Sequence, residues 1–125
     1  MEQKKLIGNL GEDIACQFLI MNNYAILEKN YTNKQGKRLG EVDIIAQSKN
    51  GIHFIEVKTR TDKKTAIFPE EAINKNKLLK IRKISQHFIK NRNLWDINYQ
   101  FDAISIIIKN DTKIASVKHL KNIFL

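Results

Sequence analysis

Hydrophobic residues recur along this chain with two different spacings, and the spacing changes from segment to segment. In residues 5–22 they return every three or four positions, which predicts an amphipathic helix that ends near a pair of asparagines. The apolar positions of this helix are Ile7, Leu10, Ile14, Phe18 and Met21. Residues 24–32 alternate instead and are rich in aromatic and branched side chains, which indicates a strand.

Residues 40–60 predict a β-hairpin around an Asn-Gly pair, because both residues tolerate the positive φ of a type I′ turn. A two-residue turn at this pair would place Asp43 opposite Lys58, whereas a four-residue turn over Ser-Lys-Asn-Gly would place Asp43 opposite Glu56. The sequence leaves both registers open. In either register one face of the hairpin is apolar and consists of Val42, Ile44, Ala46, Ile55 and Val57.

A second helix is predicted from Pro69 to about Asn91, since proline is favoured in the first turn of a helix. Its apolar stripe consists of Ile73, Leu78, Ile81, Ile84 and Phe88. Residues 99–108 and 113–120 predict two further strands, which gives the order α-β-β-β-α-β-β. A helix between the hairpin and the next strand indicates an α/β fold in which helices flank a mixed β-sheet.

The length of 125 residues predicts a single domain that spans residues 1–125. No apolar run approaches the roughly 18 residues that are needed to cross a bilayer. The N-terminal segment also lacks the apolar stretch of a secretory signal, so we expect a cytoplasmic protein without a membrane partner. Cys16 is the one cysteine, which excludes an internal disulfide, and it is expected to be a small residue of the core.

A formal net charge of +9 favours a polyanionic partner such as nucleic acid, because opposite charges attract each other over long distances. The support is weak, since lysines far outnumber arginines, as an AT-rich coding sequence would produce without selection for function. The lysines of the second helix fit a phosphate-binding face and an ordinary solvated surface equally well.

The hairpin carries charged residues on the face opposite to its apolar one. They are Glu41, Asp43, Glu56, Lys58 and Arg60. Two carboxylates that lie close together near apolar residues repel each other and lose hydration, unless a cation compensates. A hard divalent cation such as Mg²⁺ is one solution, since it takes oxygen ligands and leaves positions for water and phosphate. A solvated ladder of salt bridges, with Asp43 opposite Lys58 and Glu41 opposite Arg60, is the other.

An acidic residue on one strand followed by Glu-x-Lys on the next, here Asp43 and then Glu56-Val57-Lys58, resembles the PD-(D/E)xK nuclease superfamily. A longer series of motifs covers nearly the whole chain. The series is Gly11-Glu12, Gly40-Glu41-Val42-Asp43-Ile44-Ile45, Phe54-Ile55-Glu56-Val57-Lys58-Thr59-Arg60, Lys77 and Phe101-Asp102. In this order and spacing it is similar to the YraN-like family of small bacterial proteins. The resemblance implies a restriction-endonuclease-like fold, similar to that of archaeal Holliday junction resolvases.

The resemblance also implies roles for individual residues. Asp43 and Glu56 would be metal ligands, Glu12 would add a carboxylate from the first helix, and Lys58 would be the catalytic lysine. Glu41 would be a neighbouring carboxylate or an alternative ligand, while Arg60 and Lys77 would contact phosphate. One departure concerns Asn30-Tyr31-Thr32, where the family pattern is expected to read Asn-x-Arg and this chain lacks the basic residue.

Other chemistry-bearing residues receive simpler interpretations. Asp102 is expected to be a structural partner of a basic residue in the site. The three histidines show no metal-ligand spacing and are expected at the surface or half-buried, and Trp95 is expected to be buried over the end of the sheet. The sequence contains no P-loop, and no serine lies in the context of a nucleophile elbow.

Two functional hypotheses follow. The first is a Mg²⁺-dependent nuclease that acts on DNA phosphodiesters, with DNA favoured over RNA, branched or structured DNA as the substrate, and Mn²⁺ able to replace Mg²⁺. Cutting both strands of a junction would require a homodimer, because one small subunit offers one site. The alternative is a non-catalytic nucleic-acid-binding module that retains the nuclease fold and binds through the lysines of the second helix.

Overall fold

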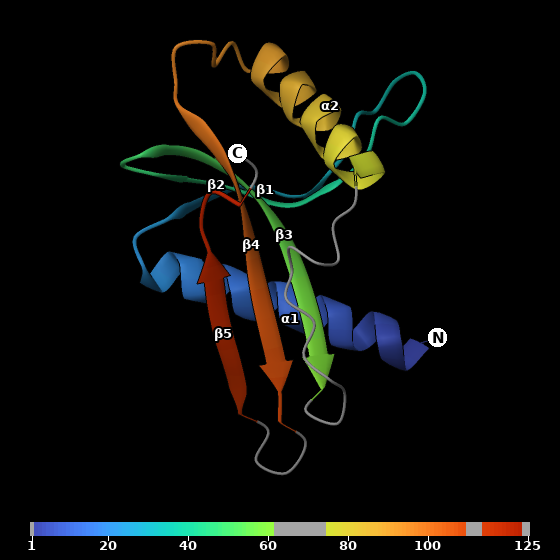
Figure 1. Cartoon of the computed structure of the whole chain (residues 1–125), viewed down its shortest axis with the longest axis vertical. Coiled ribbons are helices and arrows are strands. Elements are labelled where there is room, and N and C mark those ends of the chain that lie inside the picture. Colours follow the sequence, from blue (N-terminus) through green and yellow to red (C-terminus); the bar gives the residue numbers. More distant parts are fainter. Residues whose placement is uncertain (1, 62–74, 110–113, 124–125) are drawn as a thin grey trace.

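The computed structural model describes residues 2–61, 75–109 and 114–123. Within these ranges the chain forms two helices and five strands in the predicted order (Figure 1). The elements are α1 (Glu2–Met21), β1 (Ala25–Tyr31), β2 (Val42–Ser48), β3 (Gly51–Thr61), α2 (Lys75–Asn91), β4 (Tyr99–Ile108) and β5 (Ala115–Leu120). The predicted starts of the second helix at Pro69 and of the last strand at Lys113 lie outside the described residues.

The five strands form one sheet in the order β1-β2-β3-β4-β5. β3 and β4 are parallel, and the other neighbouring pairs are antiparallel. A parallel pair needs a crossover, and α2 lies in the connection between β3 and β4. The predicted α/β class with a mixed sheet is therefore confirmed.

The β2–β3 hairpin has the register of the four-residue turn. Ser48 is opposite Gly51, and Ile44 is opposite Ile55. Gly51 therefore belongs to the strand, where its backbone passes so close to the Asn98 carbonyl that a Cβ atom would clash with it. The Ile52 N–H donates a hydrogen bond to that carbonyl at 2.9 Å, which ties the hairpin to the residues before β4.

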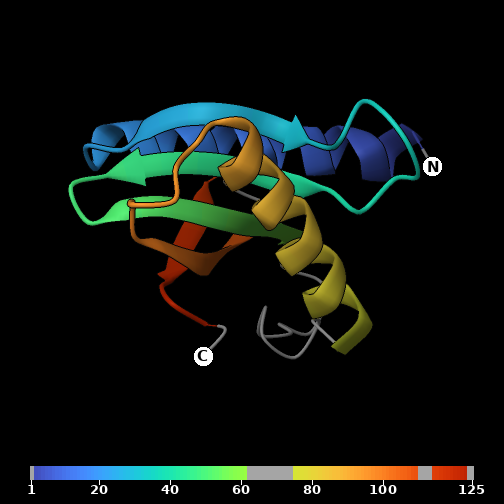
Figure 2. The same ribbon diagram turned by 90° about the horizontal axis from the view of Figure 1, so that it is seen from above.

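One helix covers each face of the sheet, as the view from above shows (Figure 2). The α1 side packs Ala15, Cys16, Leu19, Ile44, Ala46, Ile55, Val57, Ile104 and Ile106. The α2 side packs Val42, Ile45, Ile52, Phe54, Ile81, Ile84, Phe88, Ile89 and Phe101. The expected core position of Cys16 is confirmed, and neither described helix is long and apolar enough to cross a membrane.

The buried face of α1 lies about one position further along the chain than the apolar stripe that the sequence predicted. Leu10 and Met21 are 48% and 79% exposed, whereas Ala15, Cys16 and Leu19 face the sheet. The small residues on this face allow the helix to lie close to the strands, and the apolar spacing alone did not reveal that preference.

Val42 was predicted on the same face as Ile44 but packs on the α2 side. Its neighbour across the β1–β2 ladder is Tyr31, whose ring lies 5.2 Å from that of Phe88 in α2. The residue before Tyr31 is Asn30, which has a φ of 52°, and this left-handed residue interrupts the strict alternation of side chains in β1. The expected burial of Trp95 was also wrong, since this side chain is 65% exposed.

Candidate functional site

A cleft of about 470 Å³ lies between the start of β2, the middle of β3 and the N-terminal half of α2. Three of the predicted carboxylate-site residues line it, namely Glu41, Asp43 and Glu56. The helix contributes Asn76, Lys77, Lys80 and Ile81. Gly40 brings the loop before β2 against α2, because a Cβ atom there would lie only 2.9 Å from the Lys80 carbonyl oxygen.

Glu56 lies on β3, the central strand of the sheet, and is only 9% exposed. It alternates with Ile55 and Val57, which both pack on the α1 side, so its side chain points to the α2 side. Asp43 is next to it across the hairpin, where the Val57 N–H donates a hydrogen bond of 2.8 Å to Asp43 Oδ2. The antiparallel register thus brings two carboxylates together, as the sequence predicted.

The two carboxylates repel each other. Burial, and then the negative charge of Glu56, raise the pKa of Asp43 to about 7, although the hydrogen bond from Val57 acts in the opposite direction. Glu12 and Glu41 add smaller repulsive contributions to the same pKa. An aspartate that titrates near neutral pH is poised to exchange a proton or to gain a cation.

Two lysines converge on Glu56 from different elements. Lys77 of α2 donates to Glu56 Oε1 at 2.5 Å, and Lys58 of β3 lies 3.8 Å from the same oxygen. Burial and the neighbouring Lys77 ammonium lower the pKa of Lys58. Burial also acts to lower the pKa of Lys77, but the hydrogen bond to Glu56 and the nearby carboxylates outweigh it and raise that pKa. Lys77, predicted as a phosphate contact, is therefore an ion-pair partner of Glu56 in this structure.

Glu12 comes close to the site through α1. A Cβ atom on Gly11 would clash with the side chain of Thr59, so the absence of a side chain lets the helix approach β3 next to Lys58. Burial raises the pKa of Glu12, a hydrogen bond with Asn30 lowers it, and the charge of Glu41 raises it again. Asn30 belongs to the segment that departs from the family pattern, and here it interacts with Glu12.

The carboxylates do not form a complete metal-ligand cluster in this structure. In the described part of the chain, no three His, Cys, Asp or Glu side chains are close enough together to hold a metal as a set. The ligand roles of Glu12, Asp43 and Glu56 therefore stay predictions. Asp43 and Glu56 line the same cleft, together with Glu41.

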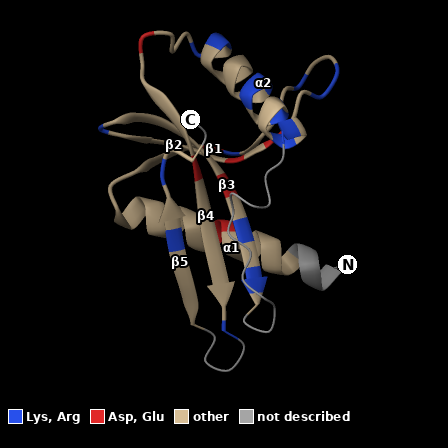
Figure 3. Ribbon diagram, in the orientation of Figure 1, with Lys and Arg blue, Asp and Glu red and all other residues tan. Residues whose placement is uncertain are grey.

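The predicted ladder of salt bridges differs from the observed ion pairs. Glu41 pairs with Arg38 at 3.0 Å, rather than with Arg60. The Nε atom of Arg60 is buried and has no hydrogen-bond partner among the described residues. Figure 3 shows basic positions along α2 and in the C-terminal half of β3. Of the basic residues of α2, Lys77 and Lys80 line the cleft.

A scan against protein families matches residues 11–106 to the uncharacterised protein family UPF0102. The chain belongs to the UPF0102 family. This is the YraN-like family that the sequence motifs indicated. The chain is 40% identical over 122 residues to a UPF0102 protein of Caldanaerobacter subterraneus, with 97% of this chain and 96% of the relative covered. It is 41% identical over 120 residues to a UPF0102 protein of Dictyoglomus thermophilum, with 96% and 98% covered.

The segment that matches UPF0102 contains all of the predicted site residues. They are Glu12, Glu41, Asp43, Glu56, Lys58, Arg60, Lys77 and Asp102. Of these, Asp102 lies apart from the cleft. It is opposite Ile55 in the parallel ladder and precedes Ile104 by two positions, and both isoleucines pack on the α1 side. Asp102 and Glu56 therefore point to opposite faces of the sheet.

Asp102 is a structural carboxylate, as expected, but its partners are histidines outside the cleft. His53 Nδ1 and His119 Nε2 donate to Asp102 Oδ2 at 2.7 and 2.9 Å. The expectation that His53 lies at the surface or half-buried was wrong, since it is 1% exposed. The sequence held one signal of this burial. Side chains alternate along a strand, so His53 lies on the same face as Ile55, two residues later, and that face is buried.

Proposed function

We propose that this protein is a Mg²⁺-dependent nuclease that hydrolyses DNA phosphodiester bonds, with branched or structured DNA as its substrate. The proposal includes a restriction-endonuclease-like arrangement of the core, in which the β2–β3 hairpin carries the catalytic residues. The observation that carries it is the pair of repelling carboxylates in the cleft, half-buried Asp43 and buried Glu56, with the Lys58 ammonium 3.8 Å from Glu56 Oε1. Structural carboxylates usually receive enough donors to stabilise their charge, whereas Asp43 accepts one hydrogen bond, from Val57, and faces the charge of Glu56.

The donor chemistry of this pair fits Mg²⁺. The ion commonly uses one or two carboxylates, several waters and the phosphate of the substrate, so it does not need a dedicated cage of protein ligands. Asp43 and Glu56 would supply the carboxylates, and Glu12 would support them from α1. Lys77 would have to leave Glu56, whose negative charge a divalent cation can neutralise in place of the ammonium.

The neighbouring residues have distinct roles in this proposal. When bound, Mg²⁺ would lower the pKa of a bound water and polarise a phosphoryl oxygen. Burial and the charge of Glu56 raise the pKa of Asp43 by destabilising its ionised form, which a bound cation would stabilise. Lys58 would stabilise the negative charge that develops on the phosphate, while Arg60 and the released Lys77 would bind the flanking backbone.

The test is cleavage of labelled linear, single-stranded, flapped and four-way-junction DNAs in the presence of Mg²⁺ or Mn²⁺. We expect Glu56→Gln to reduce cleavage by roughly a thousandfold, because a lost metal ligand costs several kcal/mol of transition-state stabilisation. Lys58→Met should reduce cleavage by about a hundredfold. Asp13→Asn, which changes an exposed carboxylate next to Glu12, is the matched control and should cleave like the wild type. Equal cleavage by all four proteins would exclude the hairpin as the active site.

A second candidate is a nucleic-acid-binding module without catalysis. The ion pair between Lys77 and Glu56 favours it, because this pair neutralises the glutamate without a metal. The two candidates differ in their response to Mg²⁺. For the nuclease, Mg²⁺ should raise the melting temperature and Asp43→Ala should abolish the rise, since only the folded protein presents both carboxylates. A binding module would show no such Mg²⁺-dependent rise.

The proposed substrate sets a requirement on assembly. A four-way junction is resolved by two cuts, and one subunit offers one cleft, so the nuclease would act as a homodimer. Sedimentation of the protein with and without junction DNA would measure this. A strictly monomeric complex that still makes paired cuts would contradict the dimer.

A further inference from the structure

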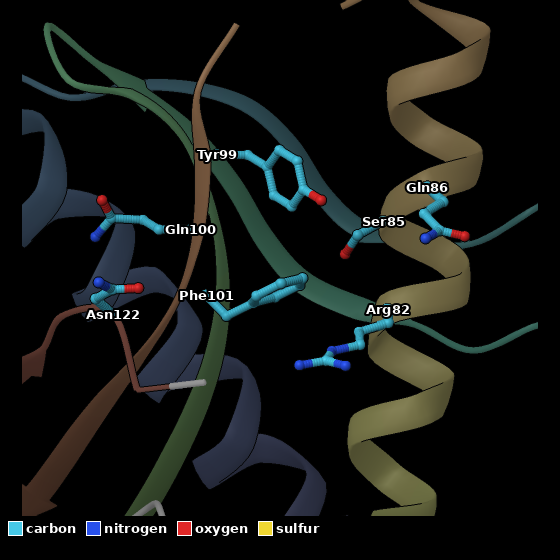
Figure 4. A pocket seen from close by; sticks show the side chains of 7 residues that line it. All are labelled: Arg82, Ser85, Gln86, Tyr99, Gln100, Phe101 and Asn122. Atoms are coloured by element: carbon cyan, nitrogen blue, oxygen red, sulfur yellow. The ribbon is translucent and has the colours of Figure 1, made fainter. Parts of the chain in front are cut away.

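A second cavity, of about 360 Å³, lies between α2 and β4. The helix contributes Arg82, Ser85 and Gln86, and Tyr99 and Phe101 come from the start of the strand. Figure 4 shows the Tyr99 and Ser85 hydroxyls and the Arg82 guanidinium directed into the space in front of the Phe101 ring. Pockets for small ligands have volumes of roughly 300–1,000 Å³, so this cavity can take one planar group of modest size.

Ser85 is the observation that points to a ligand. The side chain is 1% exposed, yet its Oγ has no hydrogen-bond partner among the described residues. A buried hydroxyl without a partner is costly, and most helical serines avoid this by bonding to solvent or to the helix backbone. A polar group that enters the cavity would satisfy this hydroxyl.

The aromatic walls specify the shape of that group. The Tyr99 and Phe101 rings are perpendicular, with centroids 5.9 Å apart, and the centroid of the Phe54 ring lies 6.0 and 5.6 Å from theirs. Tyr99 is 49% exposed, so an incoming group can reach this residue from solvent. Proteins commonly bind an unpaired base with an aromatic side chain that stacks on it and with hydroxyl or amide groups that hydrogen-bond its edge.

The position of the cavity relates it to the carboxylate cleft. Arg82 lines the cavity, and its neighbour Ile81 lines the cleft. In the sheet, Phe101 is opposite Phe54, which precedes Glu56 by two residues, or about 7 Å along the strand.

We propose that this cavity binds an unpaired nucleobase of a single DNA strand, close to the phosphate that enters the carboxylate cleft. Tyr99 stacks on the base, Ser85 hydrogen-bonds its edge, and Arg82 contacts the adjoining phosphate. The inference rests on the proposed action on nucleic acid and gives it a basis for selectivity. DNA with unpaired bases near a junction or flap would bind better than uninterrupted duplex, which has no base free to enter.

The test is binding without metal, so that it does not depend on cleavage. Fluorescence anisotropy would measure the affinity of Glu56→Gln protein for a labelled thymidine oligonucleotide and for the same strand with its central bases removed. We expect Tyr99→Ala to weaken binding of the complete strand by about tenfold and to leave the abasic strand unaffected. Trp95→Ala removes an exposed aromatic residue outside the cavity and is the matched control, with no expected loss.

Two further variants separate the base from the backbone. Ser85→Ala should weaken binding of the complete strand by about fivefold without lowering the melting temperature, since no described protein partner is lost. Arg82→Ala should weaken both strands equally, because it acts on phosphate.

Three outcomes would overturn the inference. The first is equal affinity of the Tyr99→Ala and Trp95→Ala proteins for the complete strand, and the second is failure of the strand to bind at all. The third concerns competition for the labelled strand. It is the result that a free mononucleotide displaces this strand as effectively as the unlabelled strand does, at the same concentration of nucleotides. The nuclease proposal can fail independently of this inference. Tyr99-dependent binding by a protein that cleaves no DNA would contradict the nuclease and still support the base pocket.

Discussion

Asp43 and Asp102 each lie on a strand among apolar residues. The fold nevertheless surrounds them with different groups, and their pKa values shift in opposite directions. Asp102 is fully buried and accepts hydrogen bonds from His53, His119, Gln100 and the Asn122 N–H. Burial alone would raise the pKa of Asp102, but the donors, with His119 the strongest, hold that pKa well below its usual range.

Asp43 receives one hydrogen bond, from Val57, and faces a second carboxylate on Glu56. Its pKa is therefore raised to about 7. The comparison teaches that burial does not by itself mark a functional carboxylate. What distinguishes the two sites is whether the fold supplies enough donors to stabilise the charge.

The largest expected effect is on stability, at the well-bonded aspartate. Asp102→Ala should lower the free energy of unfolding by about 3 kcal/mol and the melting temperature by roughly 10 °C, because two buried histidines lose their acceptor. Chemical denaturation would measure this. A loss below about 1 kcal/mol would mean that the network contributes little and that the contrast with Asp43 is overstated.

At Asp43, removal of the carboxylate should raise the free energy of unfolding instead of lowering it. Between its ordinary pKa of 3.8 and the folded value of about 7, the folded protein retains a proton that the unfolded chain has lost, so stability falls as the pH rises. Asp43→Asn should therefore stabilise the metal-free protein by about 1–2 kcal/mol near pH 8, with the gain shrinking toward pH 4. Denaturation curves across this range would measure it, and a gain that is independent of pH would contradict the raised pKa.

Asp102 provides the internal reference for that pH series. Because its folded pKa is lowered, its contribution to stability is present above the unfolded value of 3.8 and is lost only as the pH falls toward the folded value. The two aspartates should therefore produce opposite slopes in separate pH windows.

Lys77 is the nearer of the two lysines that partly compensate the charge of the Asp43–Glu56 pair. Lys77→Met should lower the free energy of unfolding without metal by about 1 kcal/mol, since the ion pair is only partly buried. It should also increase the stabilisation by Mg²⁺, because the ion no longer competes with the ammonium for Glu56. Thermal melts over a Mg²⁺ titration would test both effects, and a smaller Mg²⁺ response than in the wild type would contradict the competition. Lys83→Met, at an exposed position of the same helix, is the control.

The smallest effect is expected where a carboxylate is exposed. Asp13 forms an ion pair with Lys29 at 3.1 Å, but its side chain is 67% exposed. Asp13→Asn should change the free energy of unfolding by no more than about 0.5 kcal/mol. A larger change by chemical denaturation would show that exposed charges contribute as much here as buried ones.

The sequence by itself determined the order of the elements and the convergence of Asp43, Glu56 and Lys58. Both follow from local rules, since the spacing of apolar residues indicates helix or strand, and side chains alternate along a strand. Either even-numbered hairpin register put these residues on one face, so their convergence could be predicted before the turn was known.

Only the tertiary structure decided what surrounds these residues. The contact of Lys77 with Glu56 depends on how α2 crosses the sheet, and the partners of Asp102 come from β3, β4 and β5 and the segment after β5. The cavity at Ser85 likewise exists only because α2 packs against the start of β4. Periodicity fixes the directions of side chains within one element, whereas the packing of several elements fixes which side chains meet, and therefore which charges are stabilised.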